Sequence, residues 1–181
     1  MVGTQVTGKT LGVVGMGRVG RIVAKRAKYG FDMNIRYSNR SQLSPELEDG
    51  AIFHETVEDM LPHCDFLSLN CPATPDTIDL MNAERLALLP DGAILVNTSR
   101  GAVVDEDALI DALNSGKLAA AGLDVYKGEP GVNPKIAELT NTFLMPHIGS
   151  STFETRDAMG FLALDNLDAF FRGKEPPTRV A

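Results

Sequence analysis

Short apolar runs alternate along the chain with longer segments in which apolar residues recur at helical spacing. Apolar runs bounded by glycine, proline or polar residues are typical of buried strands, whereas recurrence every three to four residues indicates helices. The runs predict strands at 11–14, 33–37, 51–53, 65–70, 93–97, 119–125 and 143–145. The helical segments follow residue 20 and cover 57–61, 82–89, 105–113 and 152–171. Strands that alternate with helices predict an α/β fold with a doubly wound parallel sheet.

Particular residues mark where the helices begin and end. Thr56 and Asp105 are of the types that cap helix N-termini, and each stands at the start of a helical segment. Gly30 and Gly116 come at the ends of helical segments, and we expect them to stop the helices because glycine readily adopts a left-handed conformation. The loops between strand ends and helix starts are therefore where the chemistry should lie.

The overall composition is that of one globular domain over residues 1–181, with a short C-terminal tail at 173–181. Hydrophobic residues make up 44% and charged residues 23%, and no apolar run approaches the roughly 20 residues that a membrane span needs. The first residues lack the pattern of a signal peptide, so we expect a cytoplasmic protein that binds no membrane. The formal net charge of −7 argues against a nucleic-acid partner, because phosphate backbones are bound by basic surfaces. Cys64 and Cys71 fit neither a zinc site nor a disulfide framework, which favours reduced thiols and no metal.

The first predicted strand runs directly into a glycine-rich turn, Gly15-Met16-Gly17-Arg18-Val19-Gly20, which opens a helical segment. Gly15 permits the tight turn, Gly17 leaves room for a pyrophosphate beside the backbone, and Gly20 allows close packing of helix on strand. A helix N-terminus presents free N–H groups and positive charge to the phosphates. The strand before and the helix after the motif predict a Rossmann-type dinucleotide-binding domain, although a βα turn without a ligand has the same pattern.

The residues after the second predicted strand bear on the choice of nucleotide. An NAD-binding fold usually has an acidic residue here for the ribose 2′-hydroxyl, but this chain has Ser38, Asn39 and Arg40 instead. A hydroxyl, an amide and a guanidinium suit a 2′-phosphate, which favours NADP(H) as the cofactor, with NAD(H) as the alternative. Arg40 could equally be a solvated loop residue.

The loop after the fourth predicted strand begins with Cys71 and Pro72. Two prolines within four residues make a rigid segment that could flank the nicotinamide ribose, although an ordinary loop explains them equally well. We do not expect Cys71 to be a nucleophile, because no histidine lies near it in the sequence.

Three residues with complementary chemistry follow the later strands. Arg100 comes after the fifth, Glu129 after the sixth and His147 directly after the seventh. Because the carboxyl ends of parallel strands meet at one edge of a sheet, we expect all three side chains to lie at that edge. The other two histidines, His54 and His63, adjoin short surface elements and are expected to be solvated.

Hydride transfer to a 2-keto acid requires the functions that these three side chains supply. The Arg100 guanidinium matches the geometry of a substrate carboxylate. His147 can protonate the forming alkoxide, and a carboxylate such as Glu129 stabilises the imidazolium form that donates the proton. Such proton transfer typically contributes about 10²–10⁴-fold in rate.

Several motifs in order resemble the D-isomer-specific 2-hydroxyacid dehydrogenases. The resemblance runs from about Gly8 to Val180 and is strongest towards the glyoxylate/hydroxypyruvate reductase and phosphoglycerate dehydrogenase branches. It rests on four stretches of sequence: residues 8–20, residues 97–109, residues 122–126 with Glu129-Pro130, and residues 146–150.

The resemblance implies roles for further residues. It identifies Arg100 as the substrate-binding arginine, and Glu129 and His147 as the acid/base pair. It also implies a homodimer and a small 2-keto or 2-hydroxy acid as substrate. The positions that match the cofactor-contacting residues of the family are Arg18 and Val19 in the turn, Cys71, Pro72 and Thr77 in the flanking loop, and Thr98, Asp124 and Gly149 around the nicotinamide.

The chain departs from the family pattern at its N-terminal side. Family members have a second, substrate-side domain built mainly from an N-terminal segment, and this sequence starts almost at the cofactor domain. We therefore expect the cofactor-binding domain of a reductase that is poorly active alone. The alternative is a non-catalytic dinucleotide-binding or dimerisation module, which would have no need of Arg100, Glu129 and His147 together.

Overall fold

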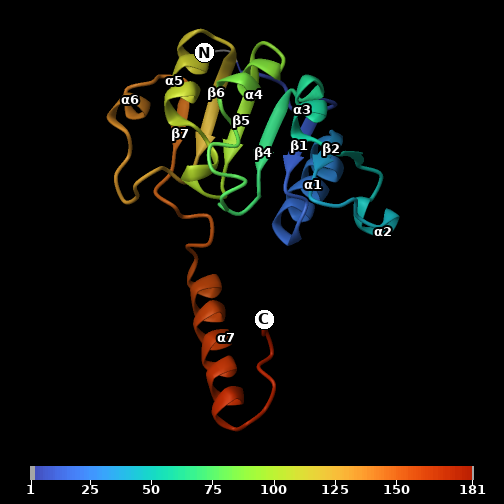
Figure 1. Ribbon diagram of the computed structural model, residues 1–181, viewed down its shortest axis with the longest axis vertical. Coiled ribbons are helices and arrows are strands. Elements are labelled where there is room, and N and C mark those ends of the chain that lie inside the picture. The colour runs from blue at the N-terminus through green and yellow to red at the C-terminus, as the bar shows by residue number, and fades with distance from the viewer. Residues whose placement is uncertain (1–2, 181) are drawn as a thin grey trace. The chain divides into compact units, whose positions relative to one another are not determined.

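The computed structural model describes residues 3–180, which fall into two compact units that divide between His147 and Ile148. The first unit contains a seven-stranded sheet in which every pairing is parallel, with strand order β3-β2-β1-β4-β5-β6-β7. Figure 1 shows the central strands of this sheet side by side. The α/β fold with a doubly wound parallel sheet is thereby confirmed. The strands are β1 Thr10–Val14, β2 Asn34–Ser38, β3 Ile52–His54, β4 Phe66–Leu69, β5 Ala93–Asn97, β6 Leu118–Leu123 and β7 Thr142–Leu144.

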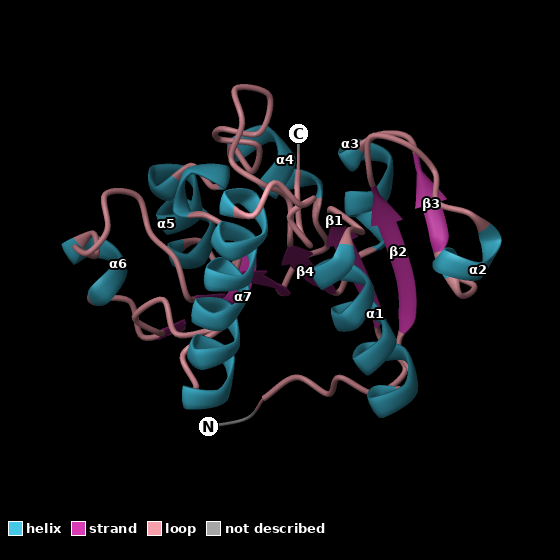
Figure 2. Cartoon of the chain, turned by 90° about the horizontal axis from the view of Figure 1, so that it is seen from below, coloured by secondary structure: helices cyan, strands magenta, loops and turns pink. Residues whose placement is uncertain are grey.

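Helices connect the strands of the first unit, and a single long helix makes up most of the second. Figure 2 shows α1 beside β1 and β2, and α2 beside β3. The α-helices are α1 Arg18–Phe31, α2 Pro45–Glu48, α3 Val57–Met60, α4 Ala83–Leu88, α5 Glu106–Asn114, α6 Pro134–Ala137 and α7 Phe153–Phe171; the 3-10 helices are η1 Leu61–His63 and η2 Gly101–Val103.

Apolar side chains are buried on both faces of the sheet. Neighbouring residues of a strand point to opposite faces, and Val13 and Val14 of β1 accordingly belong to two different core clusters. Val13 packs in the cluster that includes Ala24 of α1, whereas Val14 packs in the larger cluster that includes Leu109 of α5. Burial on both faces explains why the strands are nearly continuous apolar runs in the sequence.

The order of the strands predicts a ligand site beside β1. The chain runs from β1 outward through β2 to β3, and then returns to place β4 on the other side of β1. At such a reversal the loops after the two neighbouring strands diverge to opposite faces, and ligands of doubly wound sheets bind there. The glycine-rich turn follows β1, and the loop beginning at Asn70 follows β4.

Helix boundaries agree with the sequence prediction at most N-termini and differ at one C-terminus. Thr56 Oγ1 accepts a hydrogen bond from the Asp59 N–H at 3.1 Å, and Asp105 caps α5 in the same manner. Gly30 does not end α1, which continues to Phe31 and stops at Asp32 with φ of 54°. Aspartate tolerates the left-handed conformation better than most residues, so it can take the place of glycine there. The short helix α6 was not expected from the sequence.

The second unit holds α7, which Thr152 caps by accepting a hydrogen bond from the Thr155 N–H at 3.1 Å. No residue of α7 is buried, and its large apolar side chains occur on all sides of the helix rather than in one stripe. Within residues 3–180, none of the helices combines the length and apolar content needed to span a bilayer.

Candidate functional site

The turn between β1 and α1 is held closely against the rest of the sheet edge. Gly15 has φ of +91° and donates its N–H to the Ser38 carbonyl at 3.0 Å. A Cβ at Gly15 would lie 2.7 Å from the Cys71 nitrogen, and one at Gly20 would lie 2.2 Å from the Gly15 carbonyl oxygen. Both glycines therefore allow close packing of the backbone, because a side chain at either position would collide with it.

Gly17 differs from these two glycines because it faces open space. A Cβ built on Gly17 meets no atom within 4 Å, and the residue forms the N-cap of α1 without a side-chain hydrogen bond. The next two residues, Arg18 and Val19, are exposed in the first turn of the helix. The helix N-terminus thus presents N–H groups to a vacant surface, which is the arrangement that binds phosphate groups.

The end of β2 brings Ser38, Asn39 and Arg40 beside the glycine-rich turn. Ser38 is buried and accepts the Gly15 N–H with its carbonyl, while its hydroxyl lies at the strand end. Asn39 donates to the Ser41 carbonyl at 3.3 Å. Arg40 is exposed, and within the described part of the chain it makes no hydrogen bond or ion pair. Its guanidinium is therefore available to a ligand.

The loop after β4 contains an unsatisfied buried oxygen at the crevice. Asn70 Nδ2 donates to Ser68 Oγ at 3.0 Å, but Asn70 Oδ1 is buried and has no hydrogen-bond partner among the described residues. Buried polar atoms are nearly always paired, so this oxygen is a candidate ligand contact. Cys71 is buried, and burial raises the pKa of its thiol, which agrees with the expectation that it is no nucleophile.

The same loop closes on itself a few residues further on. Thr77 Oγ1 donates to the Pro72 carbonyl at 2.6 Å and accepts the Thr74 N–H at 2.7 Å. Pro72 is exposed at the start of this closed segment. The threonine therefore fixes the shape of the loop and leaves the proline ring at the surface beside the crevice.

Asn97 at the end of β5 shapes the loop that carries Arg100. Its Oδ1 accepts the Ser99 N–H at 3.0 Å, and its Nδ2 donates to the Arg100 carbonyl at 3.0 Å. Thr98 and Arg100 are exposed as a result, whereas Ser99 between them is buried. Asp124, the residue after β6, is buried and donates its N–H to the Asn97 carbonyl at 3.0 Å.

The loops after β6 and β7 bring Glu129 and His147 into direct contact. The Nδ1 atom of His147 lies 2.6 Å from Oε2 of Glu129, and the other carboxylate oxygen accepts the Tyr126 N–H at 2.9 Å. The hydrogen bond from His147 is the main cause that holds the pKa of Glu129 below its ordinary value, with smaller contributions from the Tyr126 N–H and the positive charge of Arg100. The ionised carboxylate thereby orients the imidazole and leaves its Nε2 for other partners.

His147 also has an unusual backbone conformation. Its φ is +55°, in the left-handed region that residues other than glycine adopt uncommonly, asparagine, aspartate and histidine more often than the rest. Such conformations are uncommon and are often found at functional sites. Together with the contact to Glu129, this conformation sets His147 apart from His54, which lies 3.0 Å from Arg36 and is partly buried rather than solvated as expected.

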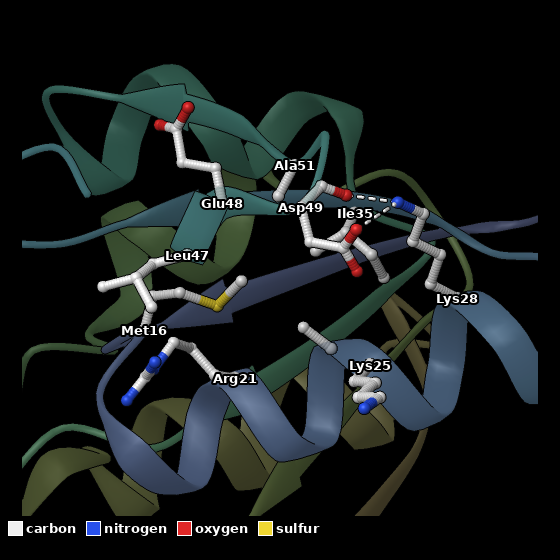
Figure 3. Close-up of a pocket in the computed structure, with 10 residues that line it drawn as sticks. Met16, Arg21, Lys25, Lys28, Ile35, Leu47, Glu48, Asp49 and Ala51 are labelled. Carbon is white, nitrogen blue, oxygen red and sulfur yellow. Dashed lines mark hydrogen bonds and ion pairs between the residues drawn. The ribbon is translucent and has the colours of Figure 1, made fainter. Parts of the chain in front are cut away.

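The first unit contains several hollows, and two of them differ clearly in size and lining. Figure 3 shows a pocket between α1 and α2, with Arg21, Lys25 and Lys28 on one side and Asp49 on the other. Its volume of about 20 Å³ holds little more than one water, so it does not fit a dinucleotide. A larger cavity of about 410 Å³ is lined by both Glu129 and His147. This second cavity has the size of a small-molecule site.

Several of the residues that shape this edge are absent from the sequence prediction. The loops are held in place by Asn70, Asn97 and Tyr126, which follow or end a strand and look like ordinary loop residues in the sequence. Only their position could have identified them, because each lies within three residues of a strand end that carries a candidate residue. Gly149 belongs to the second unit, outside the group of residues described above.

The family model described as the NAD binding domain of D-isomer specific 2-hydroxyacid dehydrogenases matches residues 1–149. The chain belongs to this family. Its first unit is therefore an NAD(P)-binding domain of the D-isomer specific 2-hydroxyacid dehydrogenases, as the sequence motifs predict.

Other members of the family are similar in sequence to this chain along nearly its whole length. A glyoxylate reductase of Pyrococcus furiosus is 47% identical over 179 residues, which are 99% of this chain and 53% of that protein. The crystal structure of a glyoxylate reductase from Paecilomyes thermophila matches with a TM-score of 0.95 and 45% identity, covering 99% of this chain and 54% of that one. An NADPH-dependent glyoxylate/hydroxypyruvate reductase from Sinorhizobium meliloti, in complex with NADP and malonate, matches with a TM-score of 0.91 and 38% identity over 96% of this chain and 53% of that one. The chain thus spans about half the length of the family members it matches.

Proposed function

We propose that this chain is the cofactor-binding part of a reductase that transfers a hydride between NAD(P)H and a small 2-keto or 2-hydroxy acid such as glyoxylate or hydroxypyruvate. The observation that carries the proposal is the Glu129–His147 contact of 2.6 Å, close enough to Arg100 for its charge to act on the carboxylate. A domain that only binds nucleotides needs no such pair. The names of the related reductases support the same class of substrate.

The residues present fit a dinucleotide. Open space over Gly17 at the start of α1 accommodates the pyrophosphate, and the unpaired Asn70 Oδ1 offers an acceptor for a hydroxyl group of the nucleotide. A cofactor that lies along the crevice would then extend from the end of β2 to the end of β6. The residues proposed to contact it are Gly15, Gly17, Arg18, Val19, Gly20, Ser38, Asn39, Arg40, Cys71, Pro72, Thr77, Thr98, Asp124 and Gly149.

The catalytic roles follow from the arrangement of the three side chains. The exposed guanidinium of Arg100 pairs with the carboxylate of the keto acid and orients its carbonyl. His147 donates a proton from Nε2 to the carbonyl oxygen, while Glu129 holds Nδ1 and stabilises the imidazolium before transfer. The nicotinamide, when bound, supplies the hydride for this reduction.

We further propose that NADP(H) is preferred over NAD(H). Arg40 is exposed and unpaired among residues 3–180, and no acidic side chain stands between it and the end of β2. A free guanidinium there favours a 2′-phosphate, whereas a carboxylate would repel it. The Sinorhizobium reductase, described as NADPH-dependent, supports this preference by similarity.

The proposal also includes a homodimer located in the cytoplasm. Family resemblance supports the dimer, and the composition of the chain supports the location. Sedimentation of the purified chain over a range of concentrations tests the first, and the location of a tagged chain in cells tests the second.

The cofactor choice is tested by titrating the chain with NADPH and with NADH. We expect tighter binding of NADPH, and a loss of about 10- to 100-fold in NADPH affinity in Arg40→Ala, because hydrogen bonds to charged groups contribute about 1.5–3 kcal/mol. NADH affinity should change little. Arg26→Ala, at an exposed position of α1, is the matched control and should leave both affinities unchanged. Equal losses of both nucleotides in Arg40→Ala would contradict the assignment.

Turnover is tested in a chimera, since the chain spans about half of its relatives. This chain replaces the matching segment of the Sinorhizobium reductase, and reduction of glyoxylate and hydroxypyruvate is followed by nucleotide absorbance. We expect reduction of at least one of the two acids. A chimera that folds and binds nucleotide but reduces neither acid would favour the non-catalytic binding module instead.

A further inference from the structure

Tyr126 contacts all three loops that carry the candidate catalytic residues. It lies three residues beyond the end of β6 and is buried, with 7% of its surface exposed. It lines the cavity of about 410 Å³ together with Glu129 and His147, but no step of the proposed reaction uses its side chain. Its contacts instead run through its backbone N–H, its hydroxyl group and its carbonyl group, and each reaches a different partner.

The backbone N–H of Tyr126 fixes one oxygen of the carboxylate. It donates to Glu129 Oε1 at 2.9 Å, while Oε2 of the same carboxylate meets His147 Nδ1 at 2.6 Å. With one oxygen held by the backbone, the carboxylate cannot rotate freely about its own axis. The position of Tyr126 therefore decides the direction in which Glu129 presents its second oxygen to the imidazole.

The hydroxyl of Tyr126 ties the loop after β6 to the loop after β7. Oη lies 2.8 Å from the Met145 carbonyl and 3.0 Å from the Leu123 carbonyl, so its single hydrogen is within reach of both. Burial raises the pKa of this hydroxyl, which keeps it a neutral donor. Met145 is two residues before His147, so this contact sets the point from which the histidine loop departs.

The carbonyl side of Tyr126 lies against the loop that carries Arg100. A Cβ at Gly101 would fall 1.9 Å from the carbonyl carbon of Tyr126 and 2.5 Å from the nitrogen of Lys127. Only glycine can lie so near this peptide, because any side chain would overlap with it. The arginine loop and the Tyr126 peptide are thus packed backbone against backbone.

We propose that Tyr126 is a positioning residue that holds the Glu129–His147 pair in register with Arg100 through its N–H, its hydroxyl and the close packing of its carbonyl on Gly101. The proposal rests on the proposed function for its catalytic meaning. Its structural content is independent of that function, because it concerns how the three loops are held together.

The first test uses the unchanged 181-residue chain, observed by NMR as pH is varied. If its N–H donates to Glu129, the amide resonance of Tyr126 should move with the ionisation of that carboxyl, which titrates below its ordinary pKa. The same movement should be absent in Glu129→Gln. A Tyr126 amide that does not respond to this titration would overturn the proposal without any change to Tyr126 itself.

The second test removes the hydroxyl with Tyr126→Phe, which keeps the ring and the backbone N–H. We expect the pKa of Glu129 to rise towards its ordinary value and the ring signals of His147 to shift, because the two loops are no longer tied. The chain has only three histidines, so these signals are readily resolved. Tyr37→Phe is the control: Tyr37 is also buried and its hydroxyl donates to Glu48 at 2.5 Å, but it belongs to the other core cluster.

The outcomes separate this inference from the proposed function. Shifts at Glu129 and His147 in Tyr126→Phe, but not in Tyr37→Phe, support the positioning role even if no reductase activity is found. Unchanged signals in a folded Tyr126→Phe would overturn the role of the hydroxyl, and equal shifts in both variants would overturn it as well, because they would reflect a general loosening of the fold. Absence of reductase activity in the chimera bears only on the proposed function.

Discussion

At the scale of single residues, the proposed chemistry depends on one carboxylate with two fixed partners. Glu129 receives hydrogen bonds from a side chain on one oxygen and from the backbone on the other. Both stabilise its ionised form, so the residue remains charged at pH values where an ordinary glutamate would begin to protonate. The ionisation of this single carboxylate can therefore be measured without any change to the fold.

The folding stability should report this carboxylate through its pH dependence. A group whose pKa is lowered on folding contributes stability above its unfolded-state pKa, and the contribution is lost as pH falls through the folded value. Glu129→Gln should therefore be less stable than the wild type near pH 7, and the difference should shrink below about pH 4.5. Because the side chains of His147 and Glu129 are 48% and 31% exposed, we expect a difference of about 1 kcal/mol or less. Urea unfolding at a series of pH values measures it, and a difference that stays constant down to pH 3 would contradict the prediction.

The role of His147 can be tested without disturbing its backbone. Asparagine accepts positive φ more readily than most residues, so His147→Asn should keep the left-handed conformation and the fold. In the chimera we expect turnover to fall by about 10²–10⁴-fold, since that is the usual contribution of a positioned proton donor. The affinity for the nucleotide should be nearly unchanged. An equal loss of affinity would make His147 a binding residue rather than an acid.

At the scale of elements, the β1–α1 turn combines glycines with two different functions. Gly20 allows the helix to pack closely on the strand, whereas Gly17 leaves the space at the helix N-terminus open. The spacing of the motif predicts this division from the sequence alone, because only the ends of the motif meet the protein. The end of α1 could not be predicted as well, since Asp32 and Gly30 are both acceptable stop residues and tertiary contacts choose between them.

Substitutions at Gly17 and Gly20 should have different effects, one on nucleotide binding and the other on stability. Gly20→Ala should destabilise the chain by about 1–3 kcal/mol, because the new methyl group overlaps with the Gly15 carbonyl. Gly17→Val should fold with little loss of stability but block both nucleotides. Thermal unfolding and nucleotide titration of the two variants distinguish these effects. Gly30→Ala is the control in the same helix: no atom lies within 4 Å of the new Cβ, and a gain of about 0.5–1 kcal/mol is expected.

At the scale of the whole molecule, the sequence predicts which residues meet at the strand ends better than it predicts the contacts that hold their loops in place. Arg100, Glu129 and His147 each follow the end of a strand, so their convergence follows from the parallel sheet. Tyr126 donates to the Met145 carbonyl in the next loop and Asn97 donates to the Arg100 carbonyl in its own loop, and such contacts arise only after the chain has folded. The short helix α6 has four residues, too few for a periodic signal.

The apolar surface of α7 predicts self-association of the chain. Helices that are apolar on all sides are normally buried, yet every residue of α7 is at least partly accessible. We expect concentration-dependent association in sedimentation velocity, and less of it in the double variant Phe161→Ser with Leu164→Ser, whose side chains are 66% and 59% exposed. Nucleotide affinity should not change. The double variant Asp157→Ser with Asp165→Ser is the control, and a wild-type chain that stays monomeric would contradict the prediction.

The two buried cysteines make it possible to measure how often the core of this chain opens. Burial raises the pKa of Cys64 to about 12, and both thiols are shielded from reagents in the folded state. Alkylation must therefore wait for the surrounding structure to open, and its rate measures how often that happens. Cys71 adjoins Gly15 at the crevice, whereas Cys64 lies beneath Gly12 in the sheet interior. A nucleotide that slows the labelling of Cys71 more than that of Cys64 would reveal local closure of the crevice in a chain that has no tryptophan to report it.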